Sequence, residues 1–348
     1  MITTGPVPAP VATPVVAPII EARGLSKRFV KRLDFAGRLA ARLGSGAVEE
    51  TVHAVDHVNL TLAKGEVVGL VGESGCGKST LGRMIAGLLP ATEGQVLYKG
   101  HDRATLDREK AHAARLAVQM IFQDPYASLN PRSRVEAIIG EAPLLHGLTT
   151  SKEASGYVDS MLTRVGLDPD FKRRYPHQFS GGQRSRIGIA RALAVQPEFL
   201  VCDEAIAALD VSIQAQVINL FMDLRRDFNL TYLFISHDLG VVQHIADRIA
   251  IMYLGRIVEM ASTEELIANG PNHPYARALL AEVPRLGREK RKFQPVKGEI
   301  PSPLDPPRGC HFHPRCPLAV ARCSVEAPKL REIAPGRHSA CHLNDSIV

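Results

Sequence analysis

The chain has 348 residues, of which 45% are hydrophobic and 22% charged, a balance ordinary for a soluble globular protein of about two domains. Its net charge of +6 suits phosphate ligands, nucleic acid or an anionic membrane surface and does not discriminate among them. No apolar run approaches the ~20 residues of a membrane-spanning helix, and no secretory signal is evident, so we expect a protein of the reducing cytoplasm that does not itself cross a bilayer.

The first stretch of the chain, residues 1–19, is rich in Pro and Ala, which predicts a disordered tail. Residues 20–29 and 52–62 alternate between apolar and polar side chains and predict two strands, joined by a basic insertion at 31–48. Phe29 ends the first of these strands. It is a candidate for stacking on a nucleotide base, and a core aromatic is the alternative.

The clearest motif begins with the apolar run 67–71, which predicts a buried strand. Glycines follow at spacings that let the backbone curl its N–H groups inward, and a helix begins next, so the segment predicts a receptor for phosphate. Lys78 supplies a charge for the β and γ phosphates and Ser79 a hydroxyl ligand for Mg²⁺. The candidate nucleotide-binding residues here are Gly72, Ser74, Gly75, Cys76, Gly77, Lys78, Ser79 and Thr80.

Residues 92–98 and 117–122 predict further strands, and the second of them ends at Gln123. The Gln123 amide could reach a metal ion or a water beside the γ-phosphate, although surface glutamines are common. Residues 126–178 predict a helical region punctuated by prolines, with helices at 133–145 and 152–165.

A second anion-receptive helix start is predicted at Ser180, Gly181, Gly182 and Gln183, where a capping serine and two glycines precede an apolar helical repeat. A plain capped helix is the alternative.

Two later strands end in polar side chains. The run 199–202 predicts a buried strand that ends at Asp203 and Glu204, on the rim where ligands of open α/β sheets bind. Asp203 can hold Mg²⁺ and Glu204 can polarise an attacking water, whereas capping of the next element is the alternative. The β-rich run 231–235 brings His237 to the same rim.

These motifs, in this order, resemble those of the ATP-binding subunit of an ABC transporter. The matching segments are Gly72–Thr80 (Walker A), Gln123 (Q-loop), Ser180–Gln183 (signature), Phe199–Glu204 (Walker B and catalytic glutamate), Ala208–Asp210 (D-loop), His237 (switch histidine) and Phe29 (A-loop). The phrases at 122–131, 208–216, 272–275 and 298–304 further resemble the dipeptide/oligopeptide (peptide/nickel) importer ATPases.

The resemblance implies an α/β P-loop NTPase fold: a RecA-like core, an antiparallel β subdomain and a helical subdomain at about 124–178, together forming a cassette at 20–267. A small Cys-containing extension at 268–348 would follow.

The resemblance also implies roles for the site residues. Ser79, Gln123 and Asp203 would hold Mg²⁺, and Glu204 would activate water while His237 holds the γ-phosphate. ATP would lie between two subunits, so the signature residues would contact a partner's nucleotide. These partner-facing residues are Ser180, Gly181, Gly182 and Gln183, with Asp210 nearby.

The implied function is hydrolysis of ATP to energise import of di- or oligopeptides. Implied partners are a second ATP-binding subunit, favoured as a paralogue over a copy of this chain, two membrane permease subunits and, indirectly, a solute-binding protein, with no nucleic acid. The implied location is peripheral, on the cytoplasmic face of the inner membrane. Alternatives are a soluble cassette ATPase acting on DNA or ribosomes, and a nickel or glutathione cargo.

Four cysteines crowd the C-terminal segment at Cys310, Cys316, Cys323 and Cys341, with five, six and seventeen residues between them. These spacings match neither paired zinc knuckles nor a ferredoxin run. The resemblance implies a [4Fe–4S] cluster, with zinc through His311 or His313 as runner-up and free cysteines as the third reading.

Overall fold

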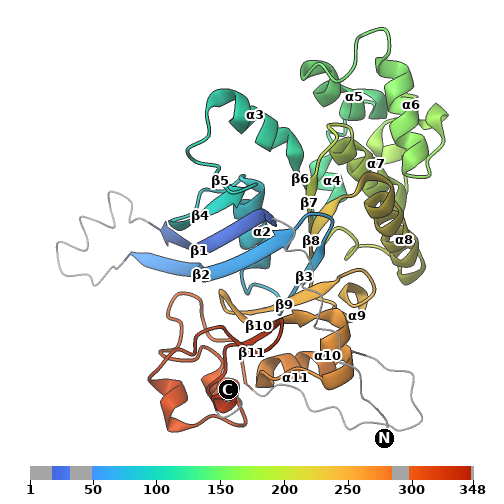
Figure 1. The fold of residues 1–348 in the computed structure, drawn as a ribbon. Helices are drawn as coiled ribbons and strands as arrows, with labels where there is room; N and C mark the ends of the chain where they lie inside the picture. The colour runs from blue at the N-terminus through green and yellow to red at the C-terminus, as the bar shows by residue number, and fades with distance from the viewer. Residues whose placement is uncertain (1–17, 32–48, 284–297, 346–348) are drawn as a thin grey trace, which may run out of the picture.

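Two β-sheets and a helical lobe make up the computed structural model, which describes residues 18–31, 49–283 and 298–345 (Figure 1). This arrangement agrees with the predicted α/β architecture. Residues 1–17 of the expected tail and residues 32–48 of the expected insertion lie outside the described residues. The expected tail was too long by two residues, because residues 18 and 19 already belong to the first strand. Within those residues, no helix combines the length and apolar composition that crossing a bilayer requires.

The smaller sheet is antiparallel and has the strand order β2-β1-β4-β5. Its strands are β1 Pro18–Lys31, β2 Glu50–Ala63, β4 Glu93–Tyr98 and β5 His101–Asp102. Ile20 in the central strand lies opposite Leu62 on one side and Tyr98 on the other. Because side chains alternate between the two faces of a strand, one face of this sheet is apolar and packs on helix α2 (Lys78–Ala86).

The larger sheet has eight strands in the order β11-β12-β10-β9-β3-β8-β7-β6. Its strands are β3 Val67–Val71, β6 Val118–Ile121, β7 Phe199–Asp203, β8 Thr231–Ser236, β9 Arg248–Tyr253, β10 Arg256–Ser262, β11 Arg331–Ala334 and β12 Arg337–Ser339. β3 is fully buried and pairs in parallel with β8 and β9, as the apolar run predicts for a strand covered on both faces. The pairs β8–β7 and β7–β6 are also parallel, so the carboxyl ends of β3, β8, β7 and β6 meet at one rim.

The helical lobe follows β6 and stands to one side of the sheets in Figure 1. Its elements are α4 Pro125–Ser128, α5 Val135–Leu145, α6 Ala154–Arg164, η1 Pro169–Arg173, η2 Pro176–Gln178 and α7 Gly181–Leu193. α5 and α6 lie within one or two residues of the predicted helices. The long helix α8 (Val211–Phe228) and the short α9 (Leu239–Val242) complete this half of the chain.

Helix α3 (Arg108–Ala117) is among the helices that were not predicted from the sequence. Ala114 is its one buried residue, so it lacks the apolar stripe by which an amphipathic helix is found. Its start is nonetheless capped, because the Asp107 side chain accepts the backbone N–H of Lys110 at 2.8 Å.

The C-terminal segment continues the large sheet. Its remaining elements are α10 Thr263–Asn269, α11 Pro274–Ala281, η3 His313–Arg315, η4 Ala321–Ser324 and η5 His342–Asn344. β12 pairs with β10 through Glu259 and Ser339, and Phe312 belongs to the main apolar cluster. The segment therefore shares its sheet and core with the rest of the chain.

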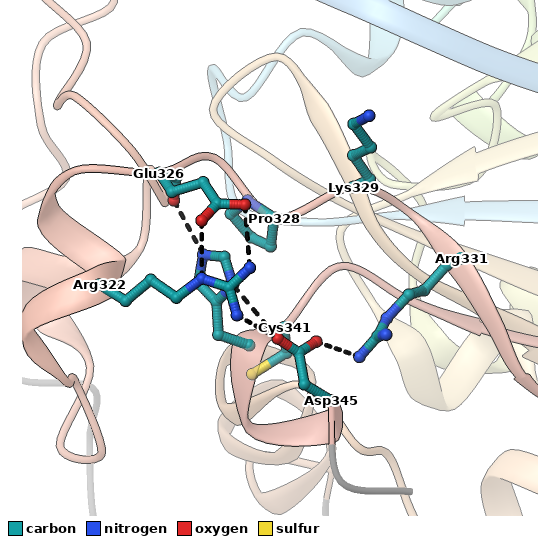
Figure 2. A pocket seen from close by; sticks show the side chains of 8 residues that line it. Arg322, Glu326, Pro328, Lys329, Arg331, Cys341 and Asp345 are labelled. Atoms are coloured by element: carbon teal, nitrogen blue, oxygen red, sulfur yellow. Dashed lines mark hydrogen bonds and ion pairs between the residues drawn. The ribbon is translucent and has the colours of Figure 1, made fainter. Parts of the chain in front are cut away.

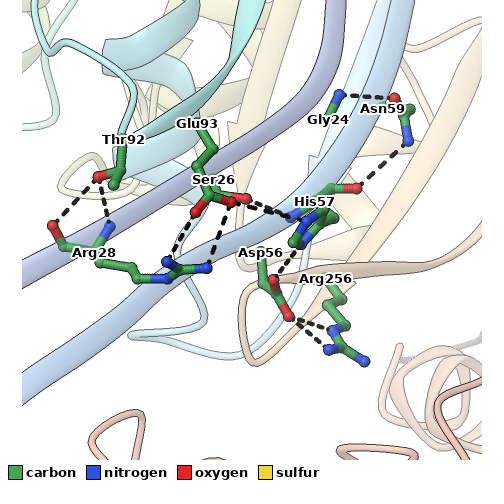
Figure 3. Close-up of polar contacts among 9 residues, drawn as sticks. All are labelled: Gly24, Ser26, Arg28, Asp56, His57, Asn59, Thr92, Glu93 and Arg256. Atoms are coloured by element: carbon green, nitrogen blue, oxygen red, sulfur yellow. Dashed lines mark hydrogen bonds and ion pairs between the residues drawn. The ribbon is translucent and has the colours of Figure 1, made fainter.

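An ion pair ties the small sheet to the large one. Asp56 Oδ2 of β2 accepts a hydrogen bond from Arg256 Nε of β10 at 2.7 Å, and Arg256 Nη2 lies 2.6 Å from the same oxygen (Figure 3). The Asp56 carboxylate also contacts His57 Nδ1 at 2.7 Å. A backbone bond from Asp56 N–H to the Gly255 carbonyl, at 2.9 Å, runs alongside. These contacts hold the antiparallel sheet against the hairpin formed by β9 and β10.

Candidate active site

The loop between β3 and α2 is closed by its own lysine. Lys78 Nζ donates to the carbonyl oxygens of Gly72 at 2.8 Å and Glu73 at 3.0 Å, and the residue is buried. Gly77 has φ +105°, and a Cβ there would lie 2.1 Å from the Ala54 carbonyl oxygen. The loop can therefore keep this shape only with glycine at that position.

Ser79 and Asp203 come together although they are far apart in sequence. Ser79 Oγ donates to Asp203 Oδ1 at 2.7 Å, and Asp203 is 1% exposed at the end of β7. Burial raises the pKa of Asp203, while the Ser79 hydrogen bond and the charge of Arg83 act in the opposite direction. A hydroxyl and a carboxylate at this distance are oxygen ligands of the kind that Mg²⁺ takes beside bound phosphates.

Two other residues of the predicted site lie close to the Glu204 carboxylate. Gln123 Nε2 donates to Glu204 Oε2 at 2.7 Å, and His237 Nδ1 lies 3.5 Å from the same oxygen. The Glu204 side chain is 12% exposed and that of His237 is 56% exposed, so the histidine faces solvent and the carboxylate lies below it. Parallel strands β6, β7 and β8 explain this convergence, because each of the three residues follows one of them.

The backbone of Glu204 has φ +45°, a left-handed conformation that costs a non-glycine residue of the order of 1–3 kcal/mol. Its N–H is held by the Ile235 carbonyl at 3.0 Å. Strained backbone of this kind gathers at functional sites, where the surrounding structure holds it in place.

The predicted signature segment starts helix α7, apart from the phosphate loop. Ser180 caps the helix by accepting the Gln183 N–H at 3.4 Å, and Gln183 Oε1 accepts the Ser180 N–H at 3.1 Å. Gly182 lies close to α8, since a Cβ there would be 2.6 Å from Ile213 Cγ2. Within the described residues, no hydrogen bond or ion pair joins Ser180 or Gln183 to the phosphate loop.

Two further candidates lie outside the cluster around Glu204. Phe29 is 42% exposed, with Lys27 Nζ 5.2 Å from its ring centroid, so the core-aromatic alternative is wrong. Asp210 is the N-cap residue of α8, yet its side chain makes no capping hydrogen bond.

One contact of the loop was missed from the sequence. The carboxylate of Glu73, between Gly72 and Ser74, forms an ion pair with Arg315, 242 residues further along the chain. No local pattern could pair two residues at that separation, although Arg315 lies within the cysteine-containing segment that the sequence singled out.

The four C-terminal cysteines border one small cavity together with Phe312 and His313. Burial, with the neighbouring thiols, raises the pKa of Cys310 to about 11. Across the described ranges, no three His, Cys, Asp or Glu side chains are grouped so that they could hold a metal ion. His311 contacts the Leu254 carbonyl at 3.0 Å and is not among the residues of the cavity. Neither the predicted iron–sulfur cluster nor the zinc alternative is supported by this arrangement.

Comparison with known families gives two matches along the chain. The ABC transporter family matches residues 55–207, and the family described as oligopeptide/dipeptide transporter, C-terminal region, matches residues 258–323. The first match contains every predicted site residue from Gly72 to Glu204, and the second contains Arg315 and three of the four cysteines.

Solved structures share the cassette fold. A dimeric post-hydrolysis state of the ATP-binding cassette MJ0796, bound to ADP and Pi, aligns with a TM-score of 0.59 and 26% identity over 70% of this chain and 98% of that chain. The protein cbiO1 of Clostridium perfringens, part of the ABC transporter complex cbiONQ, aligns with a TM-score of 0.58 and 24% identity over 72% of this chain and 91% of that chain. The second likeness concerns the fold alone.

A curated relative matches nearly end to end. The oligopeptide transport ATP-binding protein AppF of Bacillus subtilis is 51% identical over 329 residues, which are 93% of this chain and 97% of AppF. With the fold and the site geometry above, this identity shows that the chain belongs to the ATP-binding proteins of the oligopeptide class of ABC transporters.

Proposed function

We propose that this chain hydrolyses ATP to energise the import of peptides through membrane permease subunits. The observation that carries the proposal is the convergence of Gln123 and His237 on Glu204, next to a phosphate loop whose Ser79 is bound to Asp203. The relatives favour peptides over the nickel or glutathione alternatives, since AppF is named for oligopeptide transport.

In this proposal the phosphate loop binds the ATP phosphates. Lys78 Nζ exchanges its carbonyl partners for β- and γ-phosphate oxygens, and the loop N–H groups surround the β-phosphate. Ser79, Asp203 and Gln123 are the residues that would hold Mg²⁺. When bound, Mg²⁺ supplies positive charge that offsets the charge on the β- and γ-phosphate oxygens.

Glu204 is the general base. Its carboxylate accepts a proton from water as the water oxygen bonds to the γ-phosphorus and the bond to the β–γ bridging oxygen breaks, which yields ADP and phosphate. His237 donates a hydrogen bond to the γ-phosphate and orients the same water. Positioning and electrostatics thus account for the catalysis, as is usual for phosphoryl transfer.

Each ATP would be enclosed by two chains. Ser180 and Gly182 of one subunit contact the γ-phosphate held on the phosphate loop of the other, with Asp210 near the junction and Phe29 stacked on the base. The start of α7 supports this, because Ser180 is exposed and, among the described residues, neither Ser180 nor Gln183 bonds the chain's own phosphate loop. Loss of the γ-phosphate then lets the two subunits separate, which can drive movement in an attached permease.

The remaining partners follow from the class of transporter. We infer a second ATP-binding subunit, more readily a paralogue than a copy of this chain, and two permease subunits contacted by the helical lobe, with a solute-binding protein acting through them. The chain would lie peripherally on the cytoplasmic face of the inner membrane.

The test is purification of the tagged chain from detergent-solubilised membranes. We expect two permease proteins to copurify, and we expect ATP turnover of the complex reconstituted in liposomes to rise with binding protein and peptide. The same complex carrying Glu204→Gln should assemble and show no stimulated turnover. Recovery of ribosomes or nucleic acid in place of permeases would overturn the proposal in favour of a soluble cassette ATPase.

For the cysteine cavity we propose an iron–sulfur cluster, with zinc as the alternative. The observation behind this proposal is that all four cysteines line one cavity. The arrangement of the described side chains weighs against it, because no three His, Cys, Asp or Glu side chains among them are grouped to hold a metal ion. The cluster would fix the C-terminal segment on the sheet. Iron, sulfide and zinc assays on anaerobically purified protein test it, and a colourless preparation free of all three would contradict it.

A further inference from the structure

The carboxylate of Glu73, in the phosphate loop, is held from the C-terminal segment. Arg315 Nη1 donates to Glu73 Oε2 at 2.8 Å and Nη2 donates to Oε1 at 3.0 Å. The Arg315 side chain is 6% exposed and that of Glu73 is 27% exposed. Two parallel bonds between a guanidinium and a carboxylate fix orientation as well as distance, so the contact restrains Glu73 more tightly than a lysine could.

The backbone of Glu73 is held as well. Its N–H donates to Tyr275 Oη at 2.9 Å, and its carbonyl oxygen accepts from Lys78 Nζ at 3.0 Å. A continuous set of hydrogen bonds therefore runs from Arg315 through Glu73 to the lysine that faces the phosphates.

Arg315 is itself anchored on the aromatic core. Tyr253, Tyr275 and Phe312 are fully buried and pack on one another, with ring centroids 4.7 to 5.5 Å apart. Arg315 Nη1 also donates to Tyr253 Oη at 3.4 Å, and its backbone N–H donates to Phe312 at 3.0 Å. The guanidinium is thus bonded to strand β9 as well as to the loop, and the Arg315 backbone is bonded to a residue of the buried core.

The charge of Glu73 also matters. An unpaired carboxylate in a loop that receives a triphosphate repels the ligand, and even at about 12 Å near the protein surface one pair of like unit charges changes affinity about tenfold. Arg315 cancels that charge.

We propose that Arg315 is a positioning residue for nucleotide binding. It holds Glu73 in place, keeps Lys78 aligned and neutralises the negative charge of the Glu73 carboxylate in the phosphate loop. The C-terminal segment is then part of the ATP site, although it contacts no nucleotide. This inference rests on the proposed function of the loop as the phosphate site.

The experiment measures the Kd of MgATP by calorimetry in the full-length chain carrying Glu204→Gln, where turnover does not interfere. Arg315→Ala should raise Kd about tenfold, by the electrostatic argument above. Adding Glu73→Gln to Arg315→Ala should restore most of the affinity, because the repelling charge is gone. In the wild-type background, Arg315→Ala should raise KM for ATP more than it lowers kcat.

Arg322→Ala is the matched control. Arg322 lies in the same segment, bonds Glu326 at 2.7 Å and shares Asp345 with Arg331 (Figure 2). None of these bonds reaches the phosphate loop. The Arg322→Ala variant should leave the Kd of MgATP unchanged. Thermal unfolding of each variant reports whether it is folded. If Arg315→Ala is not folded, the milder substitution Arg315→Gln takes its place, tested alone and together with the isosteric Glu73→Gln.

Lys78→Ala separates this inference from the function on which it rests. If Lys78→Ala binds MgATP normally, the loop is not the phosphate site and the proposed function fails. If Lys78→Ala loses binding while a folded Arg315→Ala keeps it, or if Glu73→Gln does not rescue Arg315→Ala, then the role of Arg315 alone is overturned.

Discussion

Gln123 donates its side-chain amide to Glu204 at 2.7 Å, so the residue at the entrance to the helical lobe is bonded directly to the carboxylate at the end of β7. The Gln123 amide thus occupies Glu204 Oε2, the oxygen that His237 also approaches at 3.5 Å. Any displacement of the lobe that carries Gln123 with it changes the hydrogen bonding of Glu204. The hydrogen bond between Gln123 and Glu204 therefore couples the helical lobe, which is the proposed permease-facing surface, to the proposed catalytic base.

The first prediction concerns the proposed base. Glu204→Gln keeps an oxygen that can accept from Gln123 but cannot take a proton from water, so ATP turnover should fall by about 10²–10⁴-fold while MgATP still binds. A nucleotide-locked dimer should accumulate, which size-exclusion chromatography with MgATP detects. Glu264→Gln, an exposed carboxylate in the first turn of α10, is the control and should leave turnover unchanged. Normal turnover in Glu204→Gln would remove Glu204 from its proposed role.

The second prediction concerns the start of α7. Ser180→Asp preserves a capping oxygen for the Gln183 N–H, so the melting temperature should stay within a few degrees of wild type. The added charge would face a partner's γ-phosphate, so turnover should be abolished while the variant's own phosphate loop still binds MgATP. Ser180→Asn, which caps without charge, should lose less activity.

Mixing tests whether Ser180 acts on a partner's nucleotide. A mixture of Ser180→Asp and Lys78→Ala chains contains dimers with one intact composite site and should regain turnover if the chain pairs with itself. If a paralogue copurifies, the two substitutions are divided between the two subunits for the same test. Full turnover by a demonstrably monomeric chain would contradict the composite site.

The sequence was sufficient to predict a strand and its site residue where a short apolar run is followed directly by a side chain able to bind phosphate, metal or water. β3, β7 and β8 were predictable because each is a short apolar run, and parallel pairing then brings Lys78, Asp203 and His237 to one rim. Gln123 and Glu204 follow neighbouring strands of the same sheet, which is why a separation of 81 residues was no obstacle to placing them together.

Other features depend on tertiary structure. The left-handed backbone of Glu204 has no signal in residue type, because that conformation favours glycine. The contact of Arg315 with Glu73 joins two segments of unrelated pattern, and α3 lacks an apolar stripe. The cysteines could be grouped from their crowding in the sequence, yet their spacing could not define how far apart the thiols lie around the cavity.

The third prediction concerns the ion pair between the sheets. Burial, the largest single effect, would raise the pKa of Asp56, but hydrogen bonds from His57 and Arg256 together lower it below its ordinary value of 3.8. A lowered pKa in the folded state means that the pair stabilises the protein above pH 3.8, and that this contribution is lost as the pH falls through the folded pKa. Asp56→Asn should reduce the free energy of unfolding by about 1–2 kcal/mol at pH 7.

The measurement for Asp56 is urea unfolding of wild type and Asp56→Asn at a series of pH values. The difference between them should be constant above about pH 5 and should shrink below the ordinary pKa of a carboxylate. Asp223→Asn, which removes an exposed ion pair on α8, is the control and should change stability little. An Asp56→Asn deficit that stays constant into acid would show that packing, not charge, holds the two sheets together.

The last prediction concerns His273, which begins α11 and is 1% exposed. Its Nδ1 accepts the Tyr275 N–H at 3.1 Å, which requires an unprotonated nitrogen. Burial, reinforced by Arg277, lowers the pKa of His273 from 6.5 to about 3. Below pH 6.5 the unfolded chain therefore binds a proton at His273 that the folded chain does not bind. The free energy of unfolding falls by about 1.4 kcal/mol per pH unit between pH 6.5 and the folded-state pKa of about 3.

The variant His273→Asn tests this, because asparagine keeps a capping oxygen and does not titrate. Its free energy of unfolding should fall less steeply than that of wild type between pH 6.5 and 4.5, whatever its stability at pH 7.5. Equal slopes for the two proteins would show that His273 is protonated in the folded state, which would contradict the hydrogen bond to Tyr275.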